Sequence, residues 1–435
     1  MLNIKNIREN ENIVRKAIKD KQLDNKVDLD EVLKVDGEYV SILHKVESIR
    51  ALRNIETKNI SKVEGSERKD LIEKANKTKE ELKELEIKLS NITGIREDLL
   101  KKIPNLIHES VPYGIDDSEN VSIKKWGEPK KLDFPPRDHI ELGKSLGIID
   151  TEKASIVAGT RFTYLFGEAT LMQFALIQFV FETLTDSKVI KMLAEQVGNP
   201  NFETFIPVLP PVMIRSEILD KMDRLEPKEE RYVLDEDNLV LIGSAEHTMG
   251  PLHMDEMISK EQLPKRYIGY STSFRREAGN YGKDVRGIFR VHQFDKLEME
   301  SFTSSQTGFV EQDFLVAVQE YIVQKLGIPY QVVMVCTGDM GKPDFRQIDI
   351  ECWMPGQNKY RETHTSDYMT DYQSRRLNIK EKNGDFVHMN DATALAIGRT
   401  LIAILENYQL EDGSVKVPNV LQKYLNFKDI KPKKK

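Results

Sequence analysis

The stretch from Phe274 to Glu298 carries cations, an aromatic ring and acids at the spacing of two strands. We expect the strands to be joined by the glycine-rich loop from Gly279 to Gly287. Side chains two residues apart share one face of a strand, so Arg275 and Glu277 project together. On the return strand, one face carries Arg290, His292, Phe294 and Glu298. An arginine fork matches phosphate or carboxylate oxygens, a phenylalanine ring stacks on a purine, and an acid accepts a hydrogen bond from an amino group. This surface could therefore hold ATP and an amino acid.

The alternative to a nucleotide site is a β-hairpin stabilised by cross-strand ion pairs. It explains Arg275 or Glu277 better when either residue is taken alone. Arg399 favours the nucleotide. It lies in the apolar run from Ala394 to Leu405, which predicts a buried helix, and a buried arginine needs an anionic partner. A salt bridge in the core would meet that need, but a phosphate explains the position with fewer assumptions. We therefore expect Arg275 and Arg399 to be the catalytic residues.

Acidic and hydroxyl side chains farther along suit a metal ion bound to phosphates. The segment from Gln347 to Trp353 alternates apolar and acidic residues, as a strand with one face in a polar cleft would. Glu362 and Thr365 follow it. Mg²⁺ takes oxygen ligands, commonly one or two carboxylates together with substrate phosphates, so these two residues are the predicted Mg²⁺ site. Pairing of Glu362 with Arg361 is the alternative.

The chain must fold into elements that position these side chains, and the amino-terminal residues predict a helical domain separate from the one that carries the site. Apolar residues from Val32 to Ile49 recur at steps of three and four, the spacing of one face of a helix. A second series runs from Leu71 to Ile103, after Gly65. Two such helices joined by a short turn bury their apolar faces against each other. We therefore predict an antiparallel coiled-coil hairpin of about 35 residues per arm and about 50 Å in length. It forms a first domain of residues 1–103.

The tip of this hairpin has a surplus of positive charge. Nine basic residues stand against five acidic ones between Arg50 and Lys79. A solvated coiled-coil surface explains such a charge run taken alone. Beside a nucleotide-binding site, a phosphate backbone becomes the better explanation. The candidate contacts to RNA are Arg50, Arg53, Lys58, Lys62, Lys69 and Lys74.

Residues 104–435 predict a second domain of the α+β class. The boundary falls where Pro104 ends the second helix and a segment rich in proline, glycine and aspartate follows. We expect a helix from Glu168 to Gly198, strands at 205–209, 239–242, 266–274, 288–299 and 348–353, and a final helix from Ala394 to Tyr408. Irregular loops as well as helices join the strands, which favours an antiparallel sheet flanked by helices. The chain has neither the P-loop nor the dinucleotide glycine motif, so side chains must hold the nucleotide.

Composition and the start of the chain exclude several classes of protein. The 435 residues carry 64 basic and 71 acidic side chains, and this net charge of −7 argues against a uniformly basic nucleic-acid binder. The two cysteines, Cys336 and Cys352, lack zinc-ligand spacing, which indicates a reducing compartment. Charges interrupt the amino terminus where a signal peptide would be apolar, and the run from Ala169 to Phe181 is too short for a membrane span. We expect a cytoplasmic protein without a membrane or DNA partner.

Together these stretches resemble the three signature motifs of class II aminoacyl-tRNA synthetases, and in particular the seryl-tRNA synthetase family. The first motif is similar to the helix before Phe205-Ile-Pro-Val-Leu-Pro-Pro211, the second to Phe274 through Glu298, and the third to Ala394-Leu-Ala-Ile-Gly-Arg399. Ser244-Ala-Glu246, the linker at 103–112 and the amino-terminal hairpin also match, so the resemblance covers nearly the whole chain.

The chain departs from the family pattern at four places. The family more often has Thr at Ser244, Val-Pro-Leu at 247–249, Ser-Ser-Cys-Ser-Asn at 363–367 and Gly-Ser-Gly at 392–394. Hydroxyl groups are retained at the key points, so we expect serine still to fit.

The resemblance implies a role for each candidate residue. For ATP it implies Arg275, Arg276, Glu277, Arg290, Val291, Phe294, Glu362, Thr363, His364, Thr365 and Arg399, with Phe294 on adenine and Arg290 and Arg399 at the γ-phosphate. For serine it implies Ser244, Ala245, Glu246, Arg275, Glu298 and Thr393, with Glu298 at the ammonium group and Thr393 near the hydroxyl. Glu362 and Thr365 would hold Mg²⁺.

The implied activity is ATP-dependent ligation of serine to tRNA. Seryl-adenylate and pyrophosphate form first, and the seryl group then passes to the 3′ end of tRNA(Ser), while tRNA(Sec) stays open as a second acceptor. The arm would hold the tRNA outside its anticodon, and the helix from Glu168 would form a homodimer interface. Two alternatives remain: a non-catalytic paralogue that binds RNA, and a ligase for another small amino acid or a carrier protein. The arm argues against a carrier protein, and the intact motif residues argue against a paralogue that has lost catalysis.

Overall fold

The computed structural model describes residues 1–278 and 287–433, and the chain divides into two compact units, Met1–Pro104 and Asn105–Lys435. The predicted glycine-rich loop at 279–287 lies outside the described residues except for Gly287. None of the described helices is long and apolar enough to cross a membrane.

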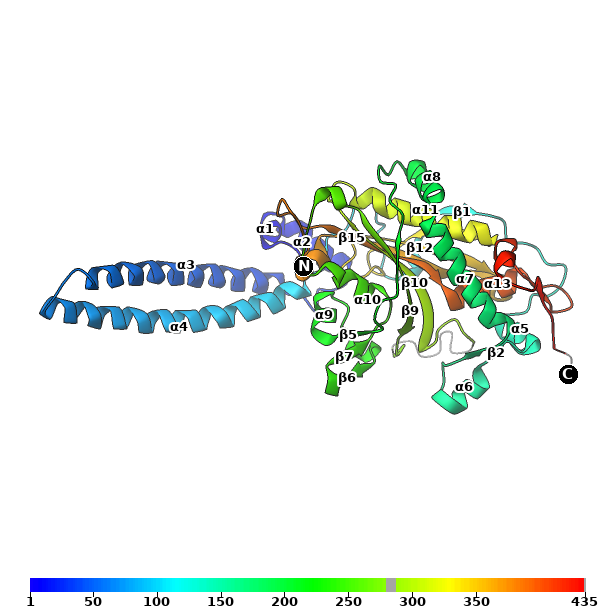
Figure 1. Ribbon diagram of the computed structural model, residues 1–435, viewed down its shortest axis with the longest axis horizontal. Helices are drawn as coiled ribbons and strands as arrows, with labels where there is room; N and C mark the ends of the chain where they lie inside the picture. The colour runs from blue at the N-terminus through cyan, green and yellow to red at the C-terminus, as the bar shows by residue number, and fades with distance from the viewer. Residues whose placement is uncertain (279–286, 434–435) are drawn as a thin grey trace. The chain divides into compact units, whose positions relative to one another are not determined.

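The first unit contains the predicted helical hairpin. It consists of α1 (Ile4–Glu9), α2 (Glu11–Asp20), α3 (Leu29–Ile60) and α4 (Ser66–Lys102) (Figure 1). The helices α3 and α4 run antiparallel and bury apolar residues of the predicted series, including Val46 and Leu82, so the coiled-coil prediction is confirmed. Asp28 caps α3 by accepting hydrogen bonds from two backbone N–H groups of its first turn. The two short helices α1 and α2 were not predicted.

A buried carboxylate ties the base of this hairpin together. Asp36 on α3 is 1% exposed, pairs with Arg8 from α1 and accepts a hydrogen bond of 2.7 Å from Arg96 Nε on α4. The Arg96 guanidinium also lies 4.5 Å from the centre of the Tyr39 ring. Three helices are therefore linked through one acid, which is stabilised because both its partners are cations.

The second unit is built on an eight-stranded sheet. Its strand order is β1 (Val121–Trp126), β11 (Tyr330–Met334), β12 (Arg346–Met354), β13 (Lys359–Thr370), β15 (His388–Ala396), β10 (Gln293–Thr303), β9 (Lys265–Phe274) and β4 (Ile206–Val208). Every neighbouring pair is antiparallel except β4 and β9. The predicted α+β class with an antiparallel sheet is confirmed.

Helices and small sheets surround the large one (Figure 1). The helices are α5 (His139–Leu146), α6 (Thr151–Ala158), α7 (Glu168–Thr185), α8 (Ser187–Val197), α9 (Ser216–Lys221), α10 (Glu246–Met249), α11 (Gly308–Leu326), α12 (Tyr372–Leu377) and α13 (Ile397–Asn407). The small sheets pair β2 (Ile149–Asp150) with β3 (Tyr164–Leu165), β5 (Met213–Arg215) and β6 (Val233–Leu234) with β7 (Leu239–Leu241), β8 (Met257–Ile258) with β14 (Lys380–Glu381), and β16 (Val415–Lys416) with β17 (Asp429–Ile430).

The two faces of the large sheet differ in chemistry. One face packs against α7, α8, α11 and α13 and contributes Leu297, Met299, Ala394 and Ile350 to the main core. Because side chains alternate along a strand, the neighbouring residues point to the opposite face, where Lys296, Glu298, Thr393 and Asp349 make a polar surface. The candidate site lies on that face.

Helix α11 bridges strands β13 and β15 from the core face of the sheet. Strands β13 and β15 pair only from Ser366↔Ala392 onward, and their ends nearer the cleft diverge. The amide of Gln319 spans this gap, since its Nε2 donates to the carbonyl oxygens of Thr365 at 2.8 Å and Thr393 at 2.9 Å. The carbonyls that the divergence leaves without a strand partner are thereby satisfied.

A buried ion pair also anchors α11 to the sheet. Arg266 on β9 donates two hydrogen bonds, of 2.6 and 2.8 Å, to Glu311, and both side chains are fully buried. Ser301 and Asn199 donate to the same carboxylate. The charge of Glu311 is therefore compensated on all sides, as burial demands.

Several predicted boundaries were wrong. The helix expected from Glu168 to Gly198 is two helices, because Asp186 takes an extended conformation and caps α8. The final helix begins at Ile397, since Ala394 belongs to β15. The strand expected from Ile288 begins only at Gln293. Helix α11 and strands β1, β11, β13 and β15 were not predicted.

Candidate active site

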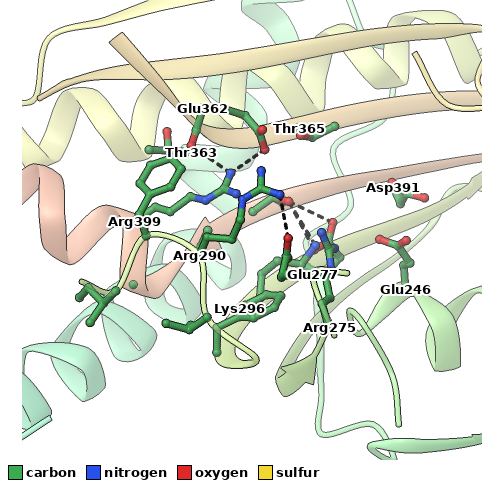
Figure 2. A pocket seen from close by; sticks show the side chains of 18 of the residues that line it. Glu246, Arg275, Glu277, Arg290, Lys296, Glu362, Thr363, Thr365, Asp391 and Arg399 are labelled. Carbon is green, nitrogen blue, oxygen red and sulfur yellow. Dashed lines mark hydrogen bonds and ion pairs between the residues drawn. The ribbon is translucent and has the colours of Figure 1, made fainter. Parts of the chain in front are cut away.

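A cleft of about 230 Å³ opens on the polar face of the large sheet. Strand β10 forms its floor with Phe294, Lys296 and Glu298, and β13 and β15 form one wall. The segment after β9 and the start of α13 close the other sides. Figure 2 shows arginines and acids from these elements turned toward one space.

The segment after β9 supplies two arginines and an acid to the cleft. Arg275 Nε donates to the Gly243 carbonyl at 3.1 Å, and its guanidinium lies 5.5 Å from the centre of the Phe294 ring. Glu277 has a φ of 51° and accepts a 2.7 Å hydrogen bond from Arg290. The prediction that these residues lie together holds, but β9 ends at Phe274, so a turn rather than strand alternation positions them. The ion-pair alternative is also realised, in the Glu277–Arg290 pair.

Arg399 approaches from the opposite side of the cleft. It donates to the carboxylate of Glu362 at 2.7 Å and to its backbone carbonyl at 3.1 Å. Its side chain is 20% exposed, so the expectation of an arginine buried in the core was wrong, because the first turn of α13 faces the cleft. Phe289 lies under the guanidinium at 4.6 Å, and Arg361 covers the same ring at 3.7 Å. The charge of Arg399 and its hydrogen bond hold the pKa of Glu362 below its usual value.

Glu298 is the central acid of the floor. It is 1% exposed, pairs with Lys296, and accepts a hydrogen bond of 3.1 Å from the Ser244 hydroxyl. The Thr393 hydroxyl lies 3.5 Å from both of its oxygens. Burial raises the pKa of Glu298 to about 7, with Lys296 opposing the shift and Glu246 adding to it.

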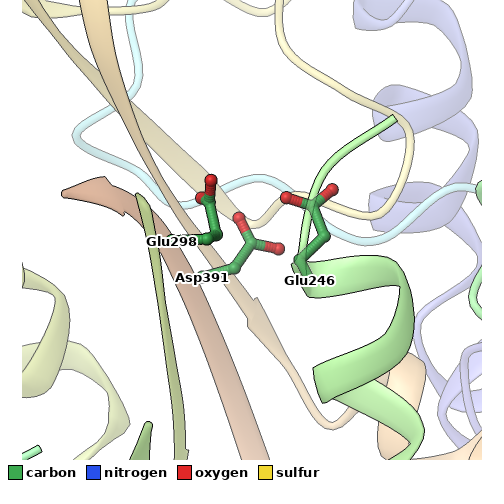
Figure 3. A group of neighbouring side chains, drawn as sticks. All are labelled: Glu246, Glu298 and Asp391. Carbon is green, nitrogen blue, oxygen red and sulfur yellow. The ribbon is translucent and has the colours of Figure 1, made fainter. Parts of the chain in front are cut away.

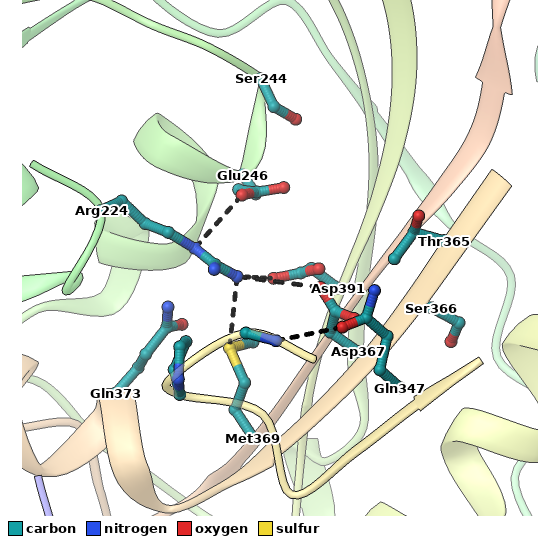
Figure 4. Close-up of polar contacts among 12 residues, drawn as sticks. Arg224, Ser244, Glu246, Gln347, Thr365, Ser366, Asp367, Met369, Gln373 and Asp391 are labelled. Atoms are coloured by element: carbon teal, nitrogen blue, oxygen red, sulfur yellow. Dashed lines mark hydrogen bonds and ion pairs between the residues drawn. The ribbon is translucent and has the colours of Figure 1, made fainter. Parts of the chain in front are cut away.

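Arg224 holds a second group of acids at the same end of the cleft (Figure 4). Its guanidinium lies 3.4 Å from Glu246, 3.4 Å from Asp391 and 3.9 Å from Asp367. Burial and neighbouring carboxylates raise the pKa of Asp391 and of Asp367 well above the usual value. Burial also works against the ionised form of Glu246, but Arg224 and other cations lower its pKa.

The donors expected for Mg²⁺ suit a phosphate-bound ion. Glu362 and Thr365 both line the cleft, and the Glu362 side chain is 46% exposed. Asp349 lies opposite Thr365 on β12, and burial raises its pKa well above the usual value. These oxygen donors fit a hard cation whose remaining ligands are phosphates and water.

Not every predicted residue reaches the cleft. Arg276 is exposed and stacks on Tyr232 at 5.2 Å. His292 Nδ1 donates to the Arg275 carbonyl at 3.1 Å, and this side chain does not line the cleft. His364 is buried on the core face of β13, where burial lowers its pKa to about 3.

Other predicted residues lie at or behind the walls. Val291, Thr363 and Thr393 line the cleft, although the Thr363 hydroxyl donates to the Ile350 carbonyl. Ser244 and Ala245 are fully buried behind Glu298 and in the small core beside β9.

Four charged residues of the cleft were not predicted as site residues, namely Lys296, Asp367, Asp391 and Arg224. Lys296 lies between Phe294 and Glu298 on the same face of β10, so alternation could have found it. Asp391 lies two residues from Thr393 on β15 and could have been found in the same way. Arg224 comes from a loop after α9, and no local pattern marks it.

The basic residues expected to contact RNA lie on the helical hairpin of the first unit. All six are exposed: Arg50, Arg53, Lys58, Lys62, Lys69 and Lys74. Arg50 pairs with Glu86 across the two helices at 2.7 Å, and Lys74 lies 3.8 Å from the buried Glu56. Within the described part of the chain, Arg53, Lys58, Lys62 and Lys69 make no ion pair, so their charges face solvent.

The antiparallel sheet and its arginine-lined cleft define a class II aminoacyl-tRNA synthetase. Residues 230–408 match the model for the tRNA synthetase class II core domain of the G, H, P, S and T enzymes, and residues 1–107 match the seryl-tRNA synthetase N-terminal domain. The chain belongs to the seryl-tRNA synthetase family. It is an enzyme of the aminoacyl-tRNA ligase type.

Its relatives match over their full length. The chain is 38% identical to the serine--tRNA ligase of Dictyoglomus turgidum, with 100% of both chains covered. The structure is similar to a seryl-tRNA synthetase from Pyrococcus horikoshii complexed with ATP, with a TM-score of 0.90, 34% identity and 100% of both chains covered. It is also similar to a cytoplasmic serine-tRNA ligase from Naegleria fowleri in complex with AMP, with a TM-score of 0.84, 30% identity and coverage of 98% and 96%.

Proposed function

We propose that the cleft activates L-serine with ATP and transfers the seryl group to tRNA(Ser), the reaction of a serine--tRNA ligase. One observation carries the proposal: a single cleft has arginines at one end and a buried acid, Glu298, at the other. The arginines suit the phosphates and the serine carboxylate, and Glu298 suits the serine ammonium group. Phe294, which lies on the floor beside Arg275, offers its ring to adenine.

The chemistry requires positioning and charge neutralisation and no covalent nucleophile. A carboxylate oxygen of serine forms a bond to the α-phosphorus, and the bond from that phosphorus to the bridging oxygen breaks, so pyrophosphate leaves. Arg275 lies between the expected positions of the serine carboxylate and the α-phosphate, and Arg290 and Arg399 take up the charge of the leaving phosphates. The terminal ribose hydroxyl of tRNA then attacks the acyl carbon, and AMP leaves.

Glu362 and Thr365 would hold Mg²⁺ against the phosphates, which adds positive charge where the leaving group develops negative charge. Arg399 forms an ion pair of 2.7 Å with the Glu362 carboxylate. The arginine must therefore share this acid with the metal or turn toward phosphate when ATP binds.

Serine is selected over its analogues by groups around Glu298. The hydroxyl of Thr393 lies on the pocket wall, and a site that hydrogen-bonds a substrate hydroxyl discriminates against an analogue without it by up to about 10⁴–10⁵. Threonine would bring an extra methyl group against the wall formed by Asp391 and Thr393. Ser244 supports Glu298 from behind through its hydroxyl.

The hairpin arm would hold tRNA by its phosphate backbone. Arg53, Lys58, Lys62 and Lys69 are exposed near the tip and make no ion pair within the described residues. Their free charges suit a polyanion, and affinity should fall steeply with salt. tRNA(Sec) remains a second possible acceptor on the same grounds, because the contacts are to shape and backbone.

Two copies of the chain would pair through α7. Leu171 and Phe174 lie on this helix, and they are 47% and 57% exposed. Ile206 on the adjoining strand β4 is 54% exposed. Such apolar side chains on neighbouring elements are typical of a protein interface. A Phe174→Glu variant should shift the mass measured by light scattering from dimer to monomer, and an unchanged mass would refute this interface.

Serine-dependent exchange of pyrophosphate into ATP tests the main proposal. Exchange should require L-serine and fall by at least about 100-fold in Arg275→Ala. Arg276→Ala is the matched control, because the adjacent arginine stacks on Tyr232 outside the cleft, and this variant should retain exchange. Absence of serine-dependent exchange, or equal losses in the two variants, would overturn the proposal. A paralogue without catalysis would show no exchange with any amino acid.

A further inference from the structure

The amino-acid end of the cleft holds more carboxylates than cations. Four acids line it, namely Glu246, Glu298, Asp367 and Asp391, and the cations of the cleft that form ion pairs with them are Arg224 and Lys296. Figure 3 shows three of the acids converging, and one oxygen from each of Glu246, Glu298 and Asp391 lies within 4.8 Å of the others. Serine carries no net charge, so its binding does not compensate the excess of acidic side chains.

The two cations compensate the acids only in part. Lys296 is engaged by Glu298 alone among these acids. Arg224 lies 3.4–3.9 Å from three carboxylates, farther than the roughly 2.7–2.9 Å of a charge-assisted hydrogen bond. Its Nε is buried and has no hydrogen-bond partner in the described structure. One guanidinium is thus shared loosely among three acids.

A fifth acid beneath the cleft points independently to a missing positive group. Glu300 is fully buried, lies on the same face of β10 as Glu298, and is opposite Asp391 in the strand register. Neither of its carboxylate oxygens has a hydrogen-bond partner within the described residues. A buried carboxyl group without a partner is costly, so a protein rarely keeps one that nothing compensates.

Several of these acids bind a proton more tightly than an isolated carboxylate does. Burial, together with the neighbouring carboxylates Asp391, Glu246 and Glu298, raises the pKa of Glu300 well above its usual value. The pKa values of Asp391 and Glu298 are raised in the same way. A cation bound among them would allow these groups to ionise and would gain their charge as binding energy.

The position of Glu246, Glu298 and Asp391 favours one kind of cation, an ammonium group of the substrate. Glu298 is the acid expected at the α-ammonium group, and Glu246 and Asp391 lie beside it where the substituent on the β-carbon would project. A hydroxyl there brings one hydrogen-bond donor and no charge. An ammonium group brings three donors and a positive charge, which matches carboxylates on several sides. A divalent metal ion fits less well, because Arg224 and Lys296 already direct fixed positive charge into the same space.

We propose that this pocket also accepts an α-amino acid with a second ammonium group on its β-carbon, and that the enzyme activates it with ATP. The inference rests on the proposed function, because the same reaction is used. A carboxylate oxygen of the diamino acid bonds to the α-phosphorus, and pyrophosphate leaves with the electron pair of the broken P–O bond. The β-ammonium group keeps its proton while it is paired with Glu246 and Asp391, so it does not compete as a nucleophile.

Pyrophosphate exchange by the full-length enzyme tests this with four amino acids. L-2,3-diaminopropionate should support exchange with a kcat/KM at least about tenfold above that of L-alanine, which lacks the β-substituent. L-2,4-diaminobutyrate, whose ammonium lies one carbon farther out, should be the poorer of the two diamino acids. L-serine measures the proposed function in the same samples.

Variants link the effect to the acids. Asp391→Asn and Glu300→Gln should each lower the ratio of kcat/KM for diaminopropionate to that for serine by about tenfold, because each removes a charge and keeps the shape. Glu381→Gln is the matched control, a buried acid on β14 outside the cleft, and it should leave the ratio unchanged. Because the readout is a ratio, a variant with less folded protein still reports on specificity.

The outcomes separate the two proposals. Diaminopropionate exchange no higher than that with alanine, in an enzyme that activates serine, would overturn the inference and leave the proposed function intact. A ratio unchanged in both acid variants would also overturn it. Exchange with diaminopropionate but not with serine would support the inference and refute serine as the substrate, and exchange with neither would refute both.

Discussion

Replacement of Arg399 by glutamine separates a catalytic role from a structural one. The two side chains of the Arg399–Glu362 pair are 20% and 46% exposed, and an exposed pair of this kind contributes about 0–1 kcal/mol to stability. Arg399 also covers Phe289, a contact worth about 0.5–1 kcal/mol at a partly exposed site. The variant should therefore lose at most about 2 kcal/mol of unfolding free energy. Removal of a charge that stabilises the transition state should lower exchange by about 10²–10³.

The assay is serine-dependent pyrophosphate exchange, with urea unfolding measured on the same preparations. Arg361→Gln is the control, because Arg361 also covers the Phe289 ring and does not line the cleft. It should cost similar stability and leave exchange within about threefold of the wild type. If Arg399→Gln retained more than a tenth of the exchange activity, or if both variants lost it equally, the assignment of Arg399 to the phosphates would be refuted.

Four further outcomes are expected. Because the pKa of Glu298 is about 7 and the ammonium group of serine needs the ionised acid, the KM for serine should fall about tenfold between pH 6 and pH 8, and a flat profile would contradict this. The same raised pKa means that protonated Glu298 stabilises the fold at a pH below the pKa that this acid has in the unfolded chain. This stabilisation is lost as the pH rises through about 7, and thermal unfolding at different pH values measures the loss. Deletion of residues 28–103 should spare exchange and lower tRNA charging by about 10³ or more, so charging that survives would refute the role of the arm. Arg266→Met should cost about 3–5 kcal/mol in urea unfolding because it leaves Glu311 buried without its cation, and pairing it with Glu311→Leu should restore much of the loss.

The parts of the fold that repeat regularly could be predicted from the sequence. The hairpin of α3 and α4 follows from apolar residues at steps of three and four, which no tertiary contact needs to modify. The split at Asp186 was missed because a capping residue inside an apolar series leaves the helical period nearly intact. Strands β13 and β15 were missed because both of their faces carry polar side chains, such as Glu362 and His364 on β13, which hides the alternation.

The site residues on regular strands could also be predicted from the sequence, whereas those placed by turns or tertiary contacts could not. Phe294 and Glu298 were found because β10 is a regular strand whose polar face is the cleft. His292 was misplaced because the strand begins after it, and a turn obeys no alternation. Arg224 lies 22 residues before Glu246 in the chain and meets it only through the folded arrangement of α9 and α10, so no reading of neighbouring residues could place it.

The amide of Gln319, on the core face of the sheet, fixes the width of the pocket on the opposite face. It joins the Thr365 and Thr393 carbonyls and so sets the distance between β13 and β15 at the cleft. A mutant library that randomises only the residues facing the cleft would leave this distance unchanged. Selection for larger amino acids should therefore recover substitutions on α11, a helix on the opposite face of the sheet, and the evolution of substrate range in this enzyme need not begin inside its active site.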